Sequence, residues 1–266
     1  DYISGSQFKY VSIKHADRAL YIYDTGLHIS YCEFLINDIG IEIRGTTDLL
    51  IDNCTFTDNS YGIWSEYEDY ISGDNIAAIE NTYIQNSLFT ENLFGVDLVT
   101  NQRDFINLNI RNNIFENNEI GIDFGGGGYG PRVHSVNIYS NIFKSNYESI
   151  KLNNIYGKSD SAVEEYPLQF YKNIVTGNGY FEGSAMSSGL WIYSIGWQMC
   201  KISNNIFDFG NEDGLVFDGS QGYNLITNNT FKSNGKTIVV PLSAGLDSRL
   251  VASGLKDLNY NQIQRT

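Results

Sequence analysis

The sequence predicts an all-β parallel solenoid from two observations. A short strand phrase recurs through most of the chain, and a second strand follows it at a nearly constant distance. The composition agrees with this fold, because the 266 residues include 30 asparagines, 31 isoleucines, 19 tyrosines and 15 phenylalanines. Such a mixture is poor in strong helix formers and rich in strand formers, which excludes a helical bundle.

The first strand phrase has an aliphatic or aromatic residue, a small polar residue three positions later, and an apolar residue two positions after that. Its small polar residues are 22 to 33 residues apart, a spacing too irregular for a helical repeat of fixed length. A degenerate copy lies at Phe8–Ile13. The clear copies are Ile29–Phe34, Ile51–Phe56, Ile84–Phe89, Ile110–Phe115, Ile138–Phe143, Phe170–Val175, Ile202–Phe207 and Ile226–Phe231.

The second strand usually opens with glycine, and its middle residue lies 10 positions after the small polar residue in most repeats, as in Asn113 and Asp123. Most of the length variation therefore falls in one connection, from this strand to the next phrase. Strands with period-two alternation and one variable loop describe a coil that rises by roughly 4.8 Å per turn. Isoleucine and phenylalanine fill its interior, and asparagines three residues after most phrases mark a tight corner.

This pattern resembles the right-handed parallel β-helix repeat family, the pectate-lyase-like group, in which asparagine ladders mark a short turn. The resemblance covers about residues 8–240. It implies a right-handed parallel β-helix of about nine coils over residues 1–240. The remaining residues, 241–266, carry apolar side chains at helical spacing and are expected to form a short helical tail.

One outward face of the second strands is the candidate functional surface. Period-two geometry directs one central residue per coil outward, and aromatic, acidic and basic residues occupy these positions. Aromatic rings stack on sugars and carboxylates bind hydroxyls or Ca²⁺, so the face suits an extended glycan. The family resemblance implies that the site lies on such a face, as it does in β-helix enzymes. The predicted glycan-binding residues are Glu42, Arg44, Trp64, Trp191 and Tyr193.

Asp97, Asp123 and Lys151 fall on consecutive coils of this face. Stacked carboxylates raise each other's pKa or bind a cation, so Asp97 and Asp123 are candidate metal ligands, with Ca²⁺ as the candidate ion. With Lys151 they are also candidate catalytic groups for acid and base chemistry on a polysaccharide. The glycine-rich loop from Gly125 onward is expected to bring His134 to the same groove. The alternative is a solvated ladder of charges with no catalytic role.

The end of the chain carries a different motif. The stretch from Ser243 to Ser248 resembles the pyrophosphate loop of N-type ATP pyrophosphatases, in particular asparagine-synthetase-like proteins, with Ala244 where that loop usually has glycine. The resemblance implies that Ser243, Gly245, Asp247 and Ser248 hold the pyrophosphate of ATP and its Mg²⁺. Residues 241–266 would then be the truncated start of such a domain.

Charge and hydropathy limit the partners. The net charge of −14 argues against a nucleic-acid partner, and no apolar run is long enough for a membrane span. Cys32 and Cys54 fall on adjacent coils, where either a disulfide or two small buried thiols is possible. We expect a monomeric, secreted or cell-surface protein that interacts with a polysaccharide or other glycan. A polysaccharide lyase, hydrolase or epimerase is the first alternative, and a fragment of an asparagine-synthetase-like ATP-binding protein is the second.

Overall fold

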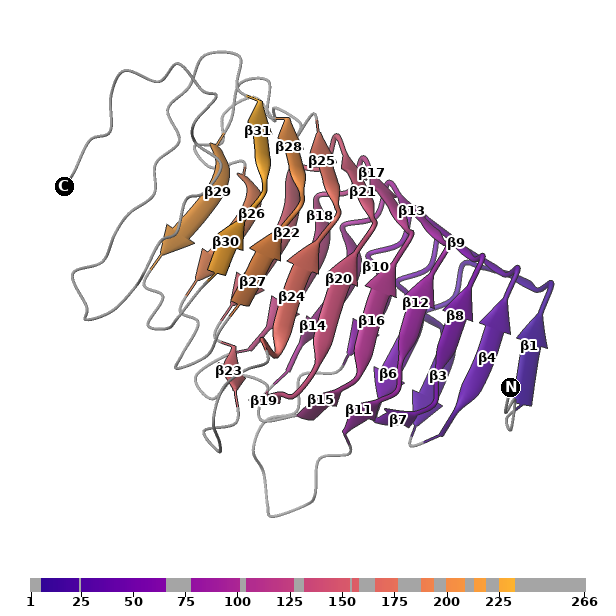
Figure 1. Ribbon diagram of the computed structural model, residues 1–266. Helices are drawn as coiled ribbons and strands as arrows, with labels where there is room; N and C mark the ends of the chain where they lie inside the picture. Colours follow the sequence, from indigo (N-terminus) through magenta and orange to yellow (C-terminus); the bar gives the residue numbers. More distant parts are fainter. Residues whose placement is uncertain are drawn as a thin grey trace, which may run out of the picture.

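The computed structural model describes residues 6–23, 25–65, 78–100, 104–126, 132–153, 155–157, 166–176, 188–193, 200–208, 213–218 and 225–232. Within these ranges the ordered elements are all strands, and they wind into a coil whose successive turns pair in parallel (Figure 1). The predicted all-β parallel β-helix is therefore confirmed. The expected helical tail at 241–266 lies outside the described residues.

Four parallel sheets run along the coil axis. Sheet A contains β1 (Ser6–Lys9), β4 (Leu27–Ser30), β8 (Leu50–Asp52), β12 (Tyr83–Gln85), β16 (Leu108–Arg111), β20 (Val136–Tyr139), β24 (Leu168–Tyr171), β27 (Cys200–Ser203) and β30 (Leu225–Thr227). Sheet B contains β2 (Ser12–Lys14), β5 (Glu33–Leu35), β9 (Thr55–Thr57), β13 (Leu88–Thr90), β17 (Ile114–Glu116), β21 (Ile142–Lys144), β25 (Ile174–Thr176), β28 (Ile206–Asp208) and β31 (Thr230–Lys232). Sheet C contains β3 (Arg18–Tyr23), β6 (Ile39–Arg44), β10 (Tyr61–Ser65), β14 (Phe94–Val99), β18 (Ile120–Gly125), β22 (Glu148–Asn153), β26 (Ser188–Tyr193) and β29 (Asp213–Asp218). The short sheet D contains β7 (Thr46–Thr47), β11 (Ile79–Glu80), β15 (Asp104–Ile106), β19 (Arg132–Val133) and β23 (Tyr156–Gly157).

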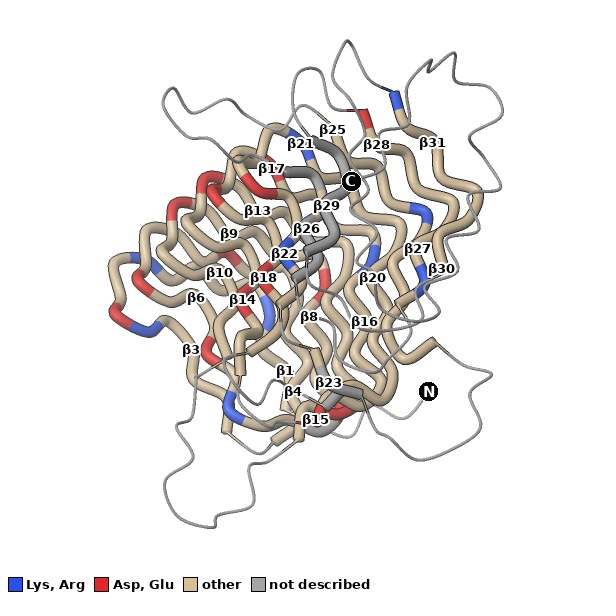
Figure 2. The backbone as a smooth tube through the Cα atoms, turned by 90° about the vertical axis from the view of Figure 1, so that its left-hand side faces the viewer, with Lys and Arg blue, Asp and Glu red and all other residues tan. Residues whose placement is uncertain are grey.

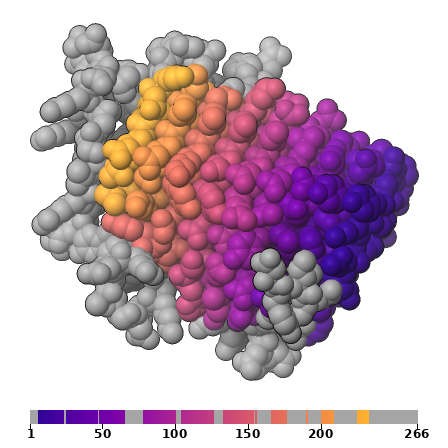
Figure 3. All heavy atoms as spheres, turned by 45° about the vertical axis from the view of Figure 1, so that its right-hand side comes forward, coloured from indigo at the N-terminus to yellow at the C-terminus, as the bar shows by residue number. Residues whose placement is uncertain are grey.

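The chain passes through sheets A, B and C in each turn and returns to sheet A, with the strands of sheet D on the return path in five of the turns. In Figure 3, where colours follow the sequence, they form successive bands along the axis, because each coil contacts the coils that precede and follow it in the chain. Most of the length variation falls between sheet C and the next strand of sheet A, as the repeat spacing predicts. A solenoid of this kind tolerates such insertions because they leave the stacked strands unchanged.

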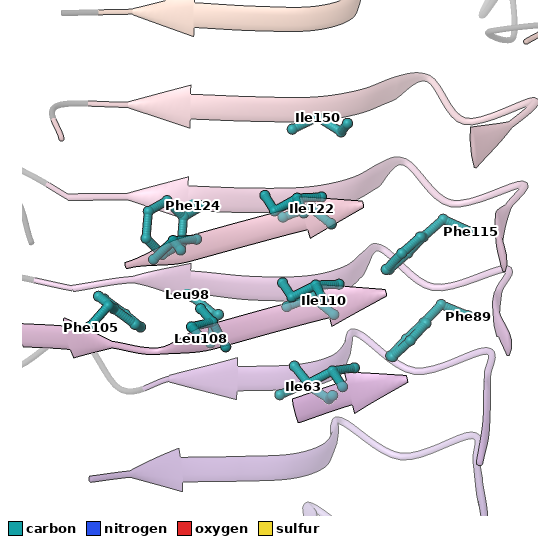
Figure 4. Close-up of a cluster of buried hydrophobic side chains, with 14 of the residues drawn as sticks. Ile63, Phe89, Leu98, Phe105, Leu108, Ile110, Phe115, Ile122, Phe124 and Ile150 are labelled. Carbon is teal, nitrogen blue, oxygen red and sulfur yellow. The ribbon is translucent and has the colours of Figure 1, made fainter. Parts of the chain in front are cut away.

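Identical side chains stack in columns inside the coil. The phenylalanines of sheet B lie on top of one another with ring centroids 4.7 to 4.9 Å apart from Phe34 through Phe56, Phe89 and Phe115 to Phe143. Figure 4 shows two of these rings, Phe89 and Phe115, facing a set of aliphatic side chains from sheets A and C. All five rings are fully buried, so they form the continuous core that the Phe and Ile excess predicts.

Two asparagine ladders hold the corners of the coil. At the corner between sheets A and B, the Asn113 N–H donates to Oδ1 of Asn141 at 3.0 Å, and Nδ2 of Asn141 donates to the Ile110 carbonyl at 2.9 Å. Asn118 and Asn146 repeat this arrangement at the corner between sheets B and C. The residue before each ladder position has a positive φ, as at Asn112 and Asn117. The amides thus satisfy backbone groups that the turn removes from the sheets.

Cys32 and Cys54 occupy ladder positions in the early coils and are free, buried thiols. The disulfide that their spacing allowed is not formed. Burial raises the pKa of Cys54 to about 12, so this thiol stays neutral. Ser87 takes the following ladder position and accepts the Cys54 N–H at 3.0 Å. Small polar or sulfur-bearing side chains can therefore replace asparagine here.

Glycine near the start of most sheet C strands has a steric cause, although β3 and β22 carry Ala19 and Ser149 at this position. A Cβ on Gly40, Gly62 or Gly95 would lie 2.5 to 2.6 Å from a carbonyl oxygen of the next coil and about 3.1 Å from a core phenylalanine. At these three positions the backbone of one coil therefore approaches the next too closely for a larger residue. This explains the recurring glycine of the second strand.

The charges of the described coils are unevenly placed. Acidic residues gather along the edge near β9, β13 and β17 in Figure 2, where Asp38, Asp58, Glu91 and Glu119 are exposed at the corner between sheets B and C.

The described residues include no helix with the length and apolarity needed to cross a bilayer.

Candidate functional site

The predicted outward row of sheet C exists as a continuous column. The strand register pairs neighbouring members one coil apart, with Glu42 beside Trp64, Trp64 beside Asp97, and Asp97 beside Asp123. We call this row the central column. Its members are Tyr21, Glu42, Trp64, Asp97, Asp123, Lys151, Trp191 and Val216.

Three aromatic residues form a cluster on this face. The rings of Tyr61 and Phe94 stack with centroids 5.0 Å apart, and the ring of Trp64 lies 5.8 Å from that of Tyr61. All three side chains are partly exposed. Tyr61 and Phe94 are not among the predicted site residues, because each precedes the strand glycine, where period-two alternation is interrupted. The sequence feature that could have identified them is the residue directly before the strand glycine, which is aromatic in these two coils.

Tyrosine and arginine side chains continue the face toward the N-terminal end. Arg18 lies over the Tyr21 ring at 5.7 Å, and the predicted binding residue Arg44 lies over the Tyr23 ring at 5.9 Å. Both tyrosine rings are exposed, at 44% and 59%. The two rings also stack on each other with centroids 6.4 Å apart, so the arginines and tyrosines hold one another in place.

Glu42 is fully buried, and its Oε2 lies 2.8 Å from Nε of Arg18. Its side chain therefore has no surface for a ligand in this structure. What the carboxylate does here is fix the guanidinium of Arg18 beside Tyr21. Direct glycan binding by Glu42 stays a prediction.

Asp97 and Asp123 are a buried carboxyl pair, 7% and 6% exposed. Nζ of Lys151 lies 3.7 Å from Oδ2 of Asp123, and the Asn153 amide donates to its Oδ1 at 3.2 Å. The Val99 N–H donates to Oδ1 of Asp97 at 3.0 Å. Both carboxyl groups are therefore largely withdrawn from solvent and lie among polar partners.

Burial raises the pKa of Asp97 to about 7, and the negative charge of Asp123 adds to the rise. Burial also raises the pKa of Asp123, but the ammonium of Lys151 opposes that effect. Both carboxyl groups thus have a raised pKa, and Lys151 favours the charged form of Asp123. Carboxyl groups with a raised pKa are candidates for acid and base chemistry.

The other candidate residues lie elsewhere or outside the described region. Nε2 of His134 lies 3.7 Å from Oδ1 of Asp104, a residue of sheet D, and the structure records no contact between His134 and the carboxyl pair. Trp191 and Tyr193 lie in register with Lys151 and Asn153, but only their backbone is described. Ser243, Gly245, Asp247 and Ser248 lie outside the described residues.

The described residues hold no group of three or more His, Cys, Asp or Glu side chains placed to bind a metal ion. The two carboxylates of the pair could supply oxygen ligands to Ca²⁺, which usually takes six to eight. A Ca²⁺ site at Asp97 and Asp123 stays a prediction.

We expect Asp97→Asn to stabilise the protein above neutral pH. Folding raises the pKa of Asp97 from 3.8 to about 7, so this group costs stability as pH rises through that window. Asparagine carries no charge to bury, and we expect a gain on the order of 2 kcal/mol at pH 8 that disappears below pH ~4. Chemical denaturation at both pH values measures it. Asp208→Asn, at a partly exposed position paired with Lys232, is the control, and an equal gain at both pH values would contradict the burial of a charge at Asp97.

Comparisons with known proteins concern the fold. The family model described as "Right handed beta helix region" matches residues 2–165. No curated protein matches the sequence. A solved structure of the Streptococcus pneumoniae surface protein and adhesin PfbA is 19% identical, with a TM-score of 0.44 over 80% of this chain and 68% of that chain. A second PfbA structure is 18% identical, with a TM-score of 0.45 over 83% and 68%. None of these matches supports the ATP-pyrophosphatase resemblance of residues 243–248.

Proposed function

The chain belongs to the right-handed β-helix family, and from that premise we propose that it binds an extended glycan along the outward face of sheet C. A glycan that follows the coil axis meets one residue of the central column per coil, because strand spacing is comparable to the length of one sugar unit. The partner is a polysaccharide or oligosaccharide, and the protein acts outside the cell or at its surface.

The aromatic cluster of Tyr61, Trp64 and Phe94 is the observation that carries this proposal. Three partly exposed rings on two adjacent coils offer apolar faces to a sugar ring. The exposed rings of Tyr21 and Tyr23 extend the surface by two coils, with Arg18 and Arg44 beside them. Ligand contact is thus proposed for the N-terminal half of the face, where side chains are accessible.

We expect Trp64→Ala to weaken glycan binding about tenfold, because stacking on an aromatic ring and the burial it brings are lost. A glycan array identifies ligands of the wild-type protein, and calorimetry with the best one gives the dissociation constants. Tyr171→Ala is the matched control, since Tyr171 is a partly exposed aromatic residue on sheet A. Equal losses in both variants, or no loss in Trp64→Ala, would contradict the proposed site.

A catalytic role on the same face is the second candidate, favoured by the raised pKa of Asp97 beside the Asp123–Lys151 ion pair. Glycoside hydrolysis uses a pair of carboxyl groups as acid and base or nucleophile, and a carboxylate can act as the base in elimination or epimerisation. Turnover of array-positive glycans should then disappear in the Asp97→Ala/Asp123→Ala double variant. Binding without turnover in the wild-type protein supports the binding role alone.

A further inference from the structure

A trough of about 310 Å³ lies at the corner between sheets A and B, on a different side of the coil from the central column. It spans the coils that contain β8, β12 and β16, which lie next to one another in Figure 1. Asn53, Asn86 and Asn112 line one side, one residue from each coil. The full lining is Tyr31, Asn53, Cys54, Thr55, Asn86, Ser87, Leu88, Asn112 and Ile114.

All nine lining residues, each within the described part of the chain, are uncharged side chains. The thiol of Cys54 also stays neutral, because burial raises its pKa to about 12. A charged ligand would find no counter-charge among these side chains. The lining therefore favours an uncharged ligand, in contrast to the acids and bases of the central column.

The amides on this corner have free hydrogen-bonding capacity. Asn86 donates from Nδ2 to Oδ1 of Asp52 at 2.7 Å, whereas the side chains of Asn53 and Asn112 make no hydrogen bond within the described residues. At the corner between sheets D and A the amides behave differently, because Asn107 donates to Asn81 at 2.9 Å. The exposed amides of Asn53 and Asn112 are thus unpaired, and Asn86 between them keeps a free amide oxygen, so all three can hydrogen-bond to hydroxyl groups.

The sheet B side of the trough is mostly apolar, with Thr55 in register beside Leu88. Leu88 and Ile114 stack in register on sheet B, and Ile114 is 40% exposed. At one end lies the Tyr31 ring, 52% exposed and stacked on Tyr10 with centroids 5.3 Å apart. A ligand with hydroxyl groups on one side and C–H groups on the other fits these two walls.

From these features we propose a second glycan site in this trough, for a neutral oligosaccharide of two or three sugar units. The three amides are one strand spacing apart, roughly 4.8 Å, which is comparable to a sugar unit. An extended peptide along the same line repeats every ~3.3 Å, so its polar groups would fall out of step with the amides. The site is independent of the face on sheet C.

The test replaces two amides without straining the backbone. Asn53 and Asn112 have φ values of 52° and 55°, a region that glycine adopts readily, so Asn53→Gly/Asn112→Gly removes the side chains and keeps the turns. Asn204→Gly/Asn228→Gly is the matched control, with the same turn conformation outside the trough. The probes are cellotriose, mannotriose and xylotriose, with trigalacturonate as the charged comparison and an uncharged extended tripeptide as the peptide comparison. Binding is measured by ligand-observed NMR.

We expect at least one neutral trisaccharide to bind about tenfold more weakly to Asn53→Gly/Asn112→Gly, with no change in the control variant or in Trp64→Ala. This result does not require glycan binding on the sheet C face, so the trough proposal can hold even if that face binds nothing. The proposal would be overturned if no neutral trisaccharide binds at millimolar concentration, or if the double variant binds as the wild type does. It would also be overturned if trigalacturonate or the tripeptide shows the same dependence on the amides. Loss of neutral-sugar binding in Trp64→Ala alone would overturn the trough and leave the sheet C proposal in place.

Discussion

Asn141→Ala is expected to lower the free energy of unfolding by about 3–5 kcal/mol, because each buried polar group left without a partner costs roughly 1–3 kcal/mol. Oδ1 of Asn141 accepts from the backbone N–H and from Nδ2 of Asn113, and its Nδ2 donates to Ile110 and to Asn173. The asparagine is 1% exposed. Alanine removes all four bonds at once and interrupts the asparagine ladder between Asn113 and Asn173.

Urea denaturation of the variant measures this loss. Asn137→Ala is the control, because Asn137 is partly exposed on sheet A and its two side-chain hydrogen bonds are long, at 3.4 and 3.5 Å. We expect the control to stay within about 0.5 kcal/mol of the wild type. A loss below about 1 kcal/mol in Asn141→Ala would show that the ladder contributes little to the corner.

Phe115→Ala is expected to cost about 3–5 kcal/mol, the usual range for removing a buried phenylalanine. Its ring is fully buried between Phe89 and Phe143, at 4.7 and 4.9 Å from their centroids. A solenoid makes contacts mainly between adjacent coils, so the cavity also weakens both neighbouring interfaces.

The control for this variant is the preceding residue. Ile114 lies in the same strand but is 40% exposed on the outer face of sheet B, so Ile114→Ala should cost less than about 1 kcal/mol. Denaturation midpoints of the two variants are compared under identical conditions. Equal losses would contradict the assignment of inward and outward positions in β17.

The fold was predictable because each turn of a solenoid repeats the same sequence pattern of strands and corners. The phrase from Ile110 to Phe115 specifies a strand, a corner and another strand, and its repetition at a constant distance from the Gly121 strand determines the register. The predicted stacking of Asp97 beside Asp123 followed from that spacing alone. Period two then assigned most residues correctly to the inside or the outside.

Burial of the outward residues was not predictable in the same way. Glu42 points outward by alternation, yet it is fully buried because Arg18 and neighbouring columns pack around it. Tyr61 was missed since the glycine after it shifts the alternation. His134 contacts Asp104, which depends on the path of a return connection and not on any repeat. Exposure on the candidate face is thus set by contacts between columns, which a repeat pattern does not encode.

A crystal structure of the protein with the tightest glycan from the array tests the central claim most directly. The proposal for sheet C predicts a sugar ring stacked on the cluster of Tyr61, Trp64 and Phe94, with the glycan continuing across successive coils of that face. A glycan found only on sheet A, on sheet B or in the corner trough, with the aromatic cluster uncovered, would contradict it.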